Sequence, residues 1–297
     1  ITPTGVDKGL MKPSDIVCVK KDGTVVGKHK PSSEYPFHLA IYNDRPDTKA
    51  LIHAHPPGMV AFSIVRKTPD TRVLPQTHLL CGKIGYAAYA LPGTAELGRS
   101  IASEFKKGIS VVIMENHGTV IGGNDISDAY QKFESIEITA RSVLYANMIG
   151  KPLSLSLHTM AEYADQIPIP IEEMGDVSYP CAEREKRLEV YKIVKRACHQ
   201  GLMLGTFGSV SARWQENDFV ITPEGVSKWD LTMHDLVQVK GGKREKGKVP
   251  SRSAYLHQGI YEKHKDINAI IITQSPYLTS FAITGTELNV RTIPETW

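Results

Sequence analysis

An internal repeat limits what this chain can fold into more than any other feature of its sequence. The first twenty residues, ITPTGVDKGLMKPSDIVCVK, return at residues 221–240 as ITPEGVSKWDLTMHDLVQVK. The match continues from KPSSEYPFHLAIY to VPSRSAYLHQGIY and from DTKALIHAHPP to DINAIIITQSP. A sequence that recurs in this way indicates one fold unit used twice in the same chain.

The two copies of the repeat cover different parts of that unit. The first copy opens at a strand and turn and continues to the helical pattern DISDAYQKFESIEITARSVLYANMIG. The second copy begins with another helix, EREKRLEVYKIVKRACHQG, and a glycine-rich turn, GTFGSVSARW, but it ends at IPETW, whose Glu295 matches only Gln76 of the first copy. We therefore expect two tandem domains that are both truncated, as in a fragment of a longer tandem protein.

A proline-containing stretch separates the two copies. Residues 151–180 carry prolines at positions 152, 168, 170 and 180 and show no clean helical or strand period. Such a composition is typical of a connecting segment. We predict a first domain at residues 1–153, a linker at 154–180 with a short helix around 159–166, and a second domain at 181–297.

Short β-rich runs alternate with helical patterns along the first copy. We expect helices at residues 33–43 and 95–107, and strands at four runs: 16–20, 51–53, 109–114 and 119–121. Alternation of this kind is typical of a sheet that is covered by helices. The residues alone therefore indicate an α/β fold.

Composition and charge indicate which kinds of binding partner this chain can have. A hydrophobic share of 41% and a charged share of 23% are ordinary for soluble globular proteins. The net charge of +3 is spread along the chain, so it does not favour nucleic-acid binding. Four cysteines without CxxC spacing indicate reduced thiols, and no apolar run approaches the length of a membrane span. We expect a cytoplasmic protein with no membrane partner.

Two histidines stand one residue apart at the end of an apolar run, in the stretch LIHAHPP. Alternate residues of a strand project from the same face, so His53 and His55 point to the same side, about 6.6 to 7 Å apart along the strand. Imidazoles at this spacing can bind one zinc ion. The pair alone leaves two interpretations open, a metal site or two half-buried histidines at a strand end.

A third histidine follows another buried run. His117 lies in VVIMENHGTVIGG, where a strand gives way to a turn before Gly118. A turn histidine that hydrogen-bonds to the backbone would explain the position equally well. If His53, His55 and His117 meet, three protein ligands leave a coordination position for water or substrate, as in catalytic rather than structural zinc sites.

The stretch KPSSE marks the start of a helix. Ser32 and Ser33 either cap the free backbone amides or help to present them to an anion such as phosphate. Thr4 and Gly5 add a hydroxyl and a glycine where the backbone can approach a ligand closely. Glu34 is either favoured in the first turn by the helix dipole or acts as a general base beside a metal.

Taken together and in this order, ITPTG, KPSSE, HAH and NHG resemble the motifs of the class II aldolase/adducin family. The resemblance covers residue 1 to about residue 152 as one domain and residues 183–297 as a second. It implies a three-layer α/β/α fold with a central, largely antiparallel sheet in each of two copies.

The family resemblance also implies a role for each motif. It places one zinc ion per chain, in the first domain only, on His53, His55 and His117. It makes Glu34 the catalytic acid/base, and it implies a set of phosphate-binding residues: Thr4, Gly5, Ser32 and Ser33. Family members also have a GTxGN loop whose asparagine contacts phosphate; the first copy shows no such segment, and the second has Ser209 at the asparagine position. Because they usually draw a tyrosine from a neighbouring subunit, we expect a homo-oligomer.

The activity implied by the resemblance is that of a zinc-dependent aldolase. Such an enzyme cleaves a ketose 1-phosphate, of the fuculose 1-phosphate type, to dihydroxyacetone phosphate and an aldehyde. Three alternatives stay open: a pentulose-phosphate 4-epimerase, a sugar-phosphate dehydratase, and a non-catalytic, adducin-like scaffold. The epimerases carry an aspartate where this chain has Glu34, and this difference favours the aldolase.

The second copy serves as an internal control for the histidine pair. The positions that match His53 and His55 hold Ile272 and Gln274, and Ser253 stands in place of the glutamate. The strand in IIITQSP keeps its apolar pattern and its trailing proline without either histidine, so the strand does not need them to fold. We therefore predict a zinc site in the first copy and none in the second.

Overall fold

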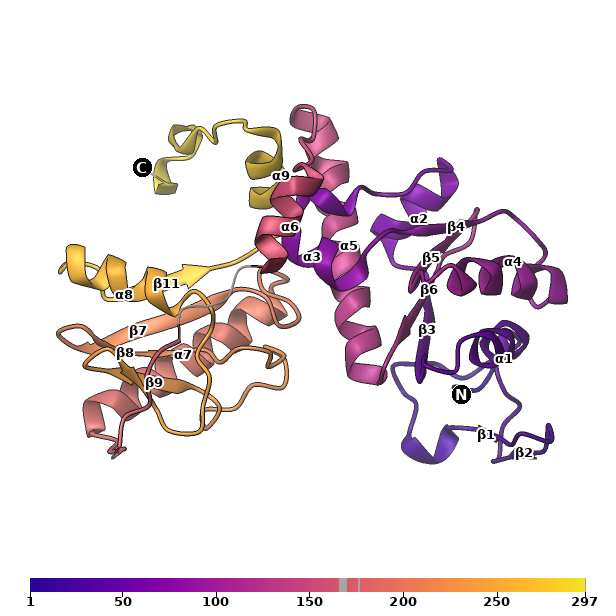
Figure 1. The fold of residues 1–297 in the computed structure, drawn as a ribbon, viewed down its shortest axis with the longest axis horizontal. Helices are drawn as coiled ribbons and strands as arrows, with labels where there is room; N and C mark the ends of the chain where they lie inside the picture. The colour runs from indigo at the N-terminus through magenta and orange to yellow at the C-terminus, as the bar shows by residue number, and fades with distance from the viewer. Residues whose placement is uncertain (166–169, 176, 297) are drawn as a thin grey trace. The chain divides into compact units, whose positions relative to one another are not determined.

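The computed structural model describes residues 1–165, 170–175 and 177–296 of the chain (Figure 1). The chain divides into two compact units, Ile1–Ala140 and Arg141–Trp297. The division lies inside the helix α5 (Ile126–Ile149). The sequence predicted domain limits at residues 153 and 181 instead, and those limits stay a proposal.

The first unit is built on a four-stranded sheet with the order β3-β6-β5-β4. Its strands are β3 (Ala50–Ala54), β4 (Gly85–Ala87), β5 (Val111–Met114) and β6 (Thr119–Gly123). β6 pairs antiparallel with both β3 and β5, whereas β4 runs parallel to β5. β5 and β6 are buried along their whole length, as expected for continuous apolar runs in the middle of a covered sheet. The predicted α/β fold with a largely antiparallel sheet is confirmed.

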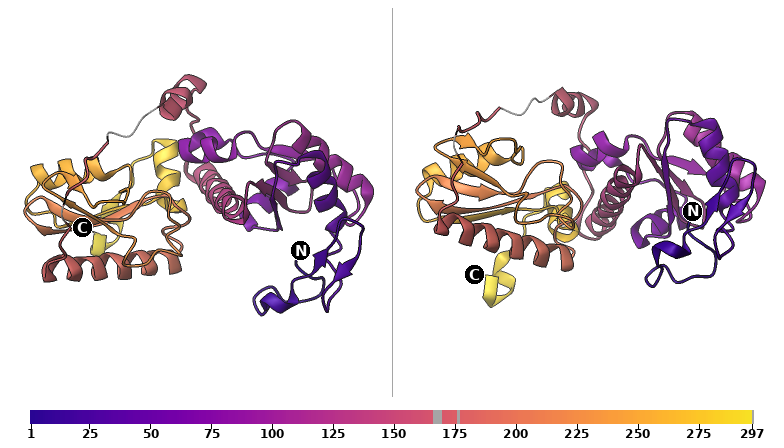
Figure 2. Two further views of the ribbon diagram at one scale, coloured as in Figure 1. Left: turned by 60° about the horizontal axis from the view of Figure 1, so that its bottom comes forward. Right: turned by 90° about the horizontal axis from the view of Figure 1, so that it is seen from below.

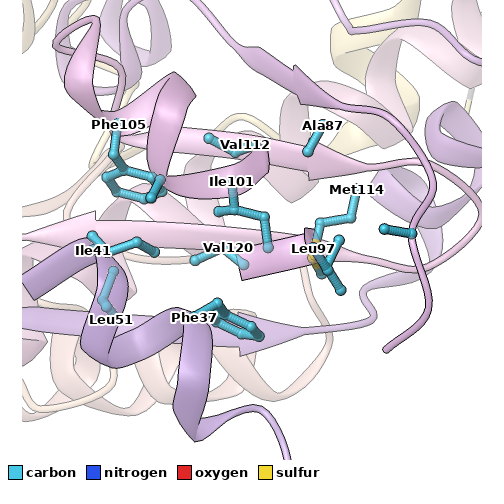
Figure 3. Packing of buried hydrophobic residues seen from close by; sticks show 12 residues of the cluster. Phe37, Ile41, Leu51, Ala87, Leu97, Ile101, Phe105, Val112, Met114 and Val120 are labelled. Carbon is cyan, nitrogen blue, oxygen red and sulfur yellow. The ribbon is translucent and has the colours of Figure 1, made fainter. Parts of the chain in front are cut away.

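Helices cover this sheet on both faces (Figure 1). α1 (Tyr35–Asp44) and α4 (Ala95–Lys106) lie on one face, and α3 (Pro75–Cys81) and α5 lie on the other. α4 packs because its large apolar residues recur every four positions and so form one stripe along the helix. Figure 3 shows this stripe against residues of α1 and the sheet, in a core that includes the following: Phe37, Ile41, Leu51, Leu97, Ile101, Phe105, Val112, Met114 and Val120.

Two short strands near the start of the first unit form a sheet of their own. β1 (Cys18–Val19) and β2 (Val25–Val26) pair antiparallel with each other and are not joined to the four-stranded sheet. Short 3-10 helices, η1 (Pro13–Asp15) and η2 (Thr71–Val73), complete the unit together with α2 (Pro57–Ile64).

The second unit contains a five-stranded antiparallel sheet with the order β10-β9-β8-β7-β11. α7 (Cys181–His199) packs on one face of this sheet and α8 (Ala254–Lys263) on the other, which makes three layers (Figure 2). The strands are β7 (Ser209–Gln215), β8 (Asp218–Ile221), β9 (Val237–Lys240), β10 (Lys243–Arg244) and β11 (Ala269–Ile272). The remaining helices are α6 (Leu157–Asp165), α9 (Pro276–Thr284), η3 (Val290–Thr292) and η4 (Pro294–Thr296).

The stretches that share sequence also share local structure. An isolated bridge joins Pro3 to Pro31 in the first unit, and another joins Pro223 to Pro250 in the second. The order α1, β3, α2 recurs as α8, β11, α9, and the first residues of these elements (35 and 254, 50 and 269, 57 and 276) are each 219 positions apart. From Pro31 onward this constant offset of 219 means that residues can be compared one by one between the two units.

Helix α6 corresponds to the short helix that the sequence predicted around residues 159–166. Residue 166 lies outside the described residues, as do positions 167–169 and 176 of the predicted linker. Among the helices in the described part of the chain, none is long and apolar enough to cross a membrane.

Candidate metal centre

The three histidines singled out by the sequence lie together in the first unit. One ring nitrogen from each histidine lies within 4.8 Å of one ring nitrogen of each of the other two. The ring centroids are 4.8 Å apart for His53 and His55, 5.0 Å for His53 and His117, and 5.1 Å for His55 and His117. This spacing allows one metal ion to contact all three rings.

The sheet explains why the histidines meet. His53 is in β3 and His55 directly follows it, so the two side chains leave the strand on the same side. His117 is in the turn between β5 and β6, and β6 pairs with β3 so that Thr119 stands opposite Ala54. The turn before Thr119 therefore lies beside the end of β3, although the two segments are more than sixty residues apart in sequence.

A glycine allows this close approach. A Cβ atom on Gly118 would lie 2.5 Å from Cδ2 of His55 and 2.6 Å from the carbonyl oxygen of Ala54. Contacts this short do not occur between real side chains, so any larger residue would push His55 aside. The neighbouring Asn116 has a φ of 51°, a left-handed conformation that asparagine tolerates better than most residues.

Hydrogen bonding and burial keep the rings of His53 and His117 neutral, which is the form that binds a metal. Nδ1 of His53 donates to the carbonyl oxygen of Thr119 at 3.1 Å, and this leaves Nε2 with a free lone pair. Burial lowers the pKa of His53 to about 4, and burial together with His55 lowers the pKa of His117. Both rings are therefore neutral at pH 7, as metal ligands must be.

A buried ring nitrogen without a hydrogen-bond partner also indicates a metal position. Nδ1 of His117 is buried and has no hydrogen-bond partner in the described residues. A buried polar atom without a partner costs about 1–3 kcal/mol, and a bound cation would remove that cost. Three nitrogen donors suit a divalent ion such as zinc and leave coordination positions open, so the residues present fit a catalytic metal.

Glu34 faces the same cavity as the histidine pair. The cavity has a volume of about 800 Å³, and its lining includes Ser32, Glu34, His53 and His55. Oε2 of Glu34 is buried without a partner among the described residues. Burial raises the pKa of Glu34, while His55 and the backbone of Gly93 lower it; the net direction is upward. A carboxyl group with a raised pKa is suited to proton transfer near neutral pH.

The predicted phosphate-binding residues are only partly brought together. Ser32 lines the cavity, and its Oγ accepts a hydrogen bond from the amide of Glu34 at 3.3 Å. Thr4, Gly5 and Ser33 are exposed and are not part of the cavity lining. Gly5 has a φ of 68°, so this position of the turn does favour glycine.

The start of α1 differs from the prediction in one detail. The N-cap of α1 is Glu34, and its side chain makes no capping hydrogen bond. The helix begins at Tyr35, two residues later than expected, because the backbone before it first makes a separate turn from Ser32 to Tyr35. Ser32 therefore stabilises this preceding turn rather than the helix itself.

One residue that supports the site could not be identified from a sequence pattern. The carboxylate of Glu137, in α5, accepts hydrogen bonds from the amides of Gly58 at 2.9 Å and Met59 at 3.1 Å. These amides are at the start of α2, which follows His55 after one residue. Glu137 thereby holds the chain just after the histidine pair. Because it is nearly eighty residues away in sequence, no local pattern could have pointed to it.

Comparison with known proteins bears on the family of this chain. The sequence model of the family described as "Class II Aldolase and Adducin N-terminal domain" matches residues 1–144 and 188–295. An L-fuculose phosphate aldolase of Methanocaldococcus jannaschii is 36% identical over 151 residues, which cover 51% of this chain and 81% of the relative. A 3-oxo-tetronate 4-phosphate decarboxylase of Haemophilus influenzae is 30% identical over 145 residues, which cover 48% of this chain and 69% of the relative.

Solved structures are similar to this chain as well. One of them, a structure of L-fuculose 1-phosphate aldolase, is 33% identical in sequence and superposes with a TM-score of 0.50. The match covers 55% of this chain and 77% of that structure's chain. The family model matches two segments that together span most of the chain. The chain therefore belongs to the class II aldolase and adducin family.

Proposed function

We propose that this chain is a zinc-dependent aldolase that cleaves a ketose 1-phosphate to dihydroxyacetone phosphate and an aldehyde. The observation that carries the proposal is the convergence of His53, His55 and His117 within 4.8 Å, with Glu34 facing the cavity that the first two line. Similarity to L-fuculose phosphate aldolases, at 36% identity, supports this substrate class.

In this proposal the three histidines hold the metal. When bound, zinc supplies Lewis acidity that polarises the carbonyl group of the sugar phosphate. The neutral rings of His53 and His117 keep their lone pairs for the metal at physiological pH. The hydrogen bond from Nδ1 of His53 to the carbonyl oxygen of Thr119 holds the ring and would leave Nε2 available to the metal.

Glu34 moves the proton that the reaction requires. In the cleavage, the hydroxyl group beyond the broken carbon–carbon bond loses its proton to a base and becomes the aldehyde oxygen. The electron pair of the broken bond passes to the carbon next to the ketone carbonyl, and that carbon must then take up a proton. The raised pKa of Glu34 lets its carboxyl group hold a proton at a higher pH than an ordinary glutamate, and this suits the role of proton donor. Its position at the start of α1 places it beside the amides of the first helical turn, which together with Ser32 would hold the phosphate.

The second unit has no part in this chemistry. Ser253, Ile272 and Gln274 stand where the first unit has its glutamate and histidine pair. Within the described residues the three histidines of the first unit are the one group able to hold a metal. One zinc ion per chain follows. The homo-oligomeric state and the cytoplasmic location stay predictions.

An aldol-cleavage assay tests the proposal. The zinc-loaded chain should release dihydroxyacetone phosphate from L-fuculose 1-phosphate or from another ketose 1-phosphate in a small stereochemical panel, and chelation should abolish the release. The panel should include a 3-oxo-tetronate 4-phosphate, since a decarboxylase of that substrate is among the relatives. Absence of cleavage of every ketose phosphate by the zinc-loaded chain would contradict the aldolase. Release of carbon dioxide alone would replace it with a decarboxylase.

A further inference from the structure

Helix α2 lies between two segments that carry the candidate metal ligands. It begins at Pro57, which follows His55 after one residue, and it ends at Ile64. The two prolines at positions 56 and 57 each fix their φ at about −65°, and a residue that precedes a proline is held in an extended conformation. The backbone of His55 is therefore joined stiffly to the start of α2.

The start of α2 is held from α5. The N-cap residue of α2 is Pro56, whose side chain carries no hydrogen-bonding group. The carboxylate of Glu137 instead accepts the amides of Gly58 and Met59, as a capping side chain would. Glu137, Gly58 and Met59 are all buried, so this end of the helix has a fixed position.

The other end of α2 contacts the turn that carries His117. The amide of Asn116 donates to the carbonyl oxygen of Ser63 at 3.4 Å. Nε of Arg66, two residues beyond the helix, lies 2.7 Å from Oε1 of Glu115. Glu115 and Asn116 directly precede His117 in the chain. One backbone contact and one ion pair thus tie the end of α2 to the third ligand.

Glu115 is also held from the side of β4. Its Oε2 accepts the amide of Tyr89 at 3.2 Å, and its own amide donates to the carbonyl oxygen of Ala87 at 2.9 Å. The side chain of Glu115 is 13% exposed, whereas that of Arg66 is 69% exposed. A largely buried carboxylate is screened less by water than an exposed one, so its attraction to the guanidinium is stronger.

The backbone of Arg66 is an independent sign that its side chain is used. Its φ is 55°, in the left-handed region that favours glycine. At the constant offset of 219, Arg66 matches Gly285, which caps the end of α9 with a φ of 66°. The second unit thus makes the same turn with glycine, and it has no histidine pair to hold. The first unit keeps an arginine where glycine would cost less free energy.

We propose that Arg66 and Glu115 are positioning residues of the metal centre. Their ion pair ties the end of α2 to the turn after β5, so that α2 sets the separation between His55 at its start and His117 beyond its end. Neither residue is among the grouped ligands, and both act through the backbone that carries those ligands. This inference rests on the metal site of the proposed function and adds that zinc affinity depends on the ion pair.

The zinc affinity of two variants of the full chain tests the inference. Arg66→Gly removes the guanidinium and supplies the residue that a φ of 55° favours. Glu115→Gln removes the charge but keeps an oxygen that can accept the amide of Tyr89. Competition with a chromogenic chelator should show that the zinc dissociation constant rises about threefold to tenfold in each variant. The double variant should show no further rise, since both changes remove the same contact.

Two further measurements separate positioning from folding. The metal-free Arg66→Gly chain should resist urea at least as well as the metal-free native chain, because glycine relieves the left-handed strain at this position. With cobalt in place of zinc, the visible absorption of the bound ion should change in both variants, since it depends on the arrangement of the ligands.

Arg72→Gln is the matched control. It removes another ion pair of the first unit, in which Nη2 of Arg72 lies 2.6 Å from Oδ2 of Asp70. Because both partners belong to the short turn around η2, this change should leave the zinc dissociation constant and the cobalt spectrum as they are.

Four results would overturn the inference. Native zinc affinity in both variants would overturn it alone and leave the metal site standing. A loss of affinity that follows an equal loss of stability in the metal-free chain would assign Arg66 and Glu115 to folding. An equal effect in Arg72→Gln would show that any lost ion pair acts in this way. A native chain that binds no zinc would remove the metal site, and this inference with it.

Discussion

At the scale of single residues, Gly118 decides how closely His117 can approach the histidine pair. In Gly118→Ala the new Cβ would meet the ring of His55 at 2.5 Å and the backbone of Ala54 at 2.6 Å, and backbone cannot move aside cheaply. We expect the zinc dissociation constant to rise at least about tenfold, because one ligand is displaced. Competition with a chromogenic chelator measures this change. Gly259→Ala is the matched control, since its Cβ would meet nothing within 4 Å; an equal loss of affinity there would contradict the steric argument.

The role of Glu34 in catalysis can be tested separately from metal binding. Glu34→Gln keeps the size of the side chain but cannot transfer the proton, so we expect kcat for aldol cleavage to fall about 10² to 10⁴-fold. Zinc content should stay unchanged, since Glu34 is not among the grouped ligands. Steady-state kinetics and metal analysis on the same preparation give both values. Glu96→Gln, at an exposed position in the first turn of α4, should leave kcat as it is. Loss of zinc in Glu34→Gln would show that the residue acts on the metal instead.

His257 gives a prediction for the pH dependence of stability. Burial lowers its pKa to about 4 in the folded chain, below the value of about 6.5 for an unfolded histidine. Between these values the unfolded chain binds a proton that the folded chain does not, so the free energy of unfolding falls as the pH falls from 6.5 towards 4. Urea unfolding at several pH values should show a smaller fall in His257→Gln. His158→Gln, at an exposed position, should show the same fall in the free energy of unfolding as the native chain. Identical pH profiles for the native chain, His257→Gln and His158→Gln would refute the role given to His257.

At the scale of elements, α7 depends on a buried ion pair. Arg187 lies 2.5 Å from a carboxylate oxygen of Glu183 and 3.2 Å from one of Glu245, and its guanidinium also donates to the carbonyl oxygen of Leu236. Arg187→Met leaves Glu183, which is fully buried, without its counter-charge, and should lower the free energy of unfolding by about 3–5 kcal/mol. Lys186→Met breaks only a half-exposed pair and should cost less than about 1 kcal/mol. Chemical denaturation measures both, and equal effects would contradict the account.

Helices and strands whose apolar residues recur at a regular spacing could be predicted from the sequence. Elements that bury polar side chains, or that are very short, could not. α4 was expected at residues 95–107 and is observed at Ala95–Lys106, because its stripe of large apolar residues is regular. The glycine-rich stretch GTFGSVSARW predicts a turn, but its second half forms strand β7. Its inward serines, Ser209 and Ser211, bond to a buried histidine and so hide the alternation that identifies a strand. β4, with only three residues, is too short to show a period.

At the scale of the whole molecule, the repeat made the histidine cluster predictable. The comparison of His53 and His55 with Ile272 and Gln274 showed that the strand can fold without histidines, and the structure then brings both of them together with His117. The ion pair between Arg66 and Glu115 could not be predicted in the same way. It depends on how the end of α2 lies beside the turn after β5, and partners far apart in sequence leave no local pattern. The role of Glu137 in holding the start of α2 was hidden for the same reason.

Whether His53, His55 and His117 form one divalent metal site can be measured by equilibrium dialysis of the full chain against zinc, followed by elemental analysis. We expect about one tightly bound zinc per native chain and less than about 0.1 per chain when all three histidines are replaced by alanine. A native chain that binds no zinc, or a triple variant that keeps a full equivalent, would exclude the proposed site.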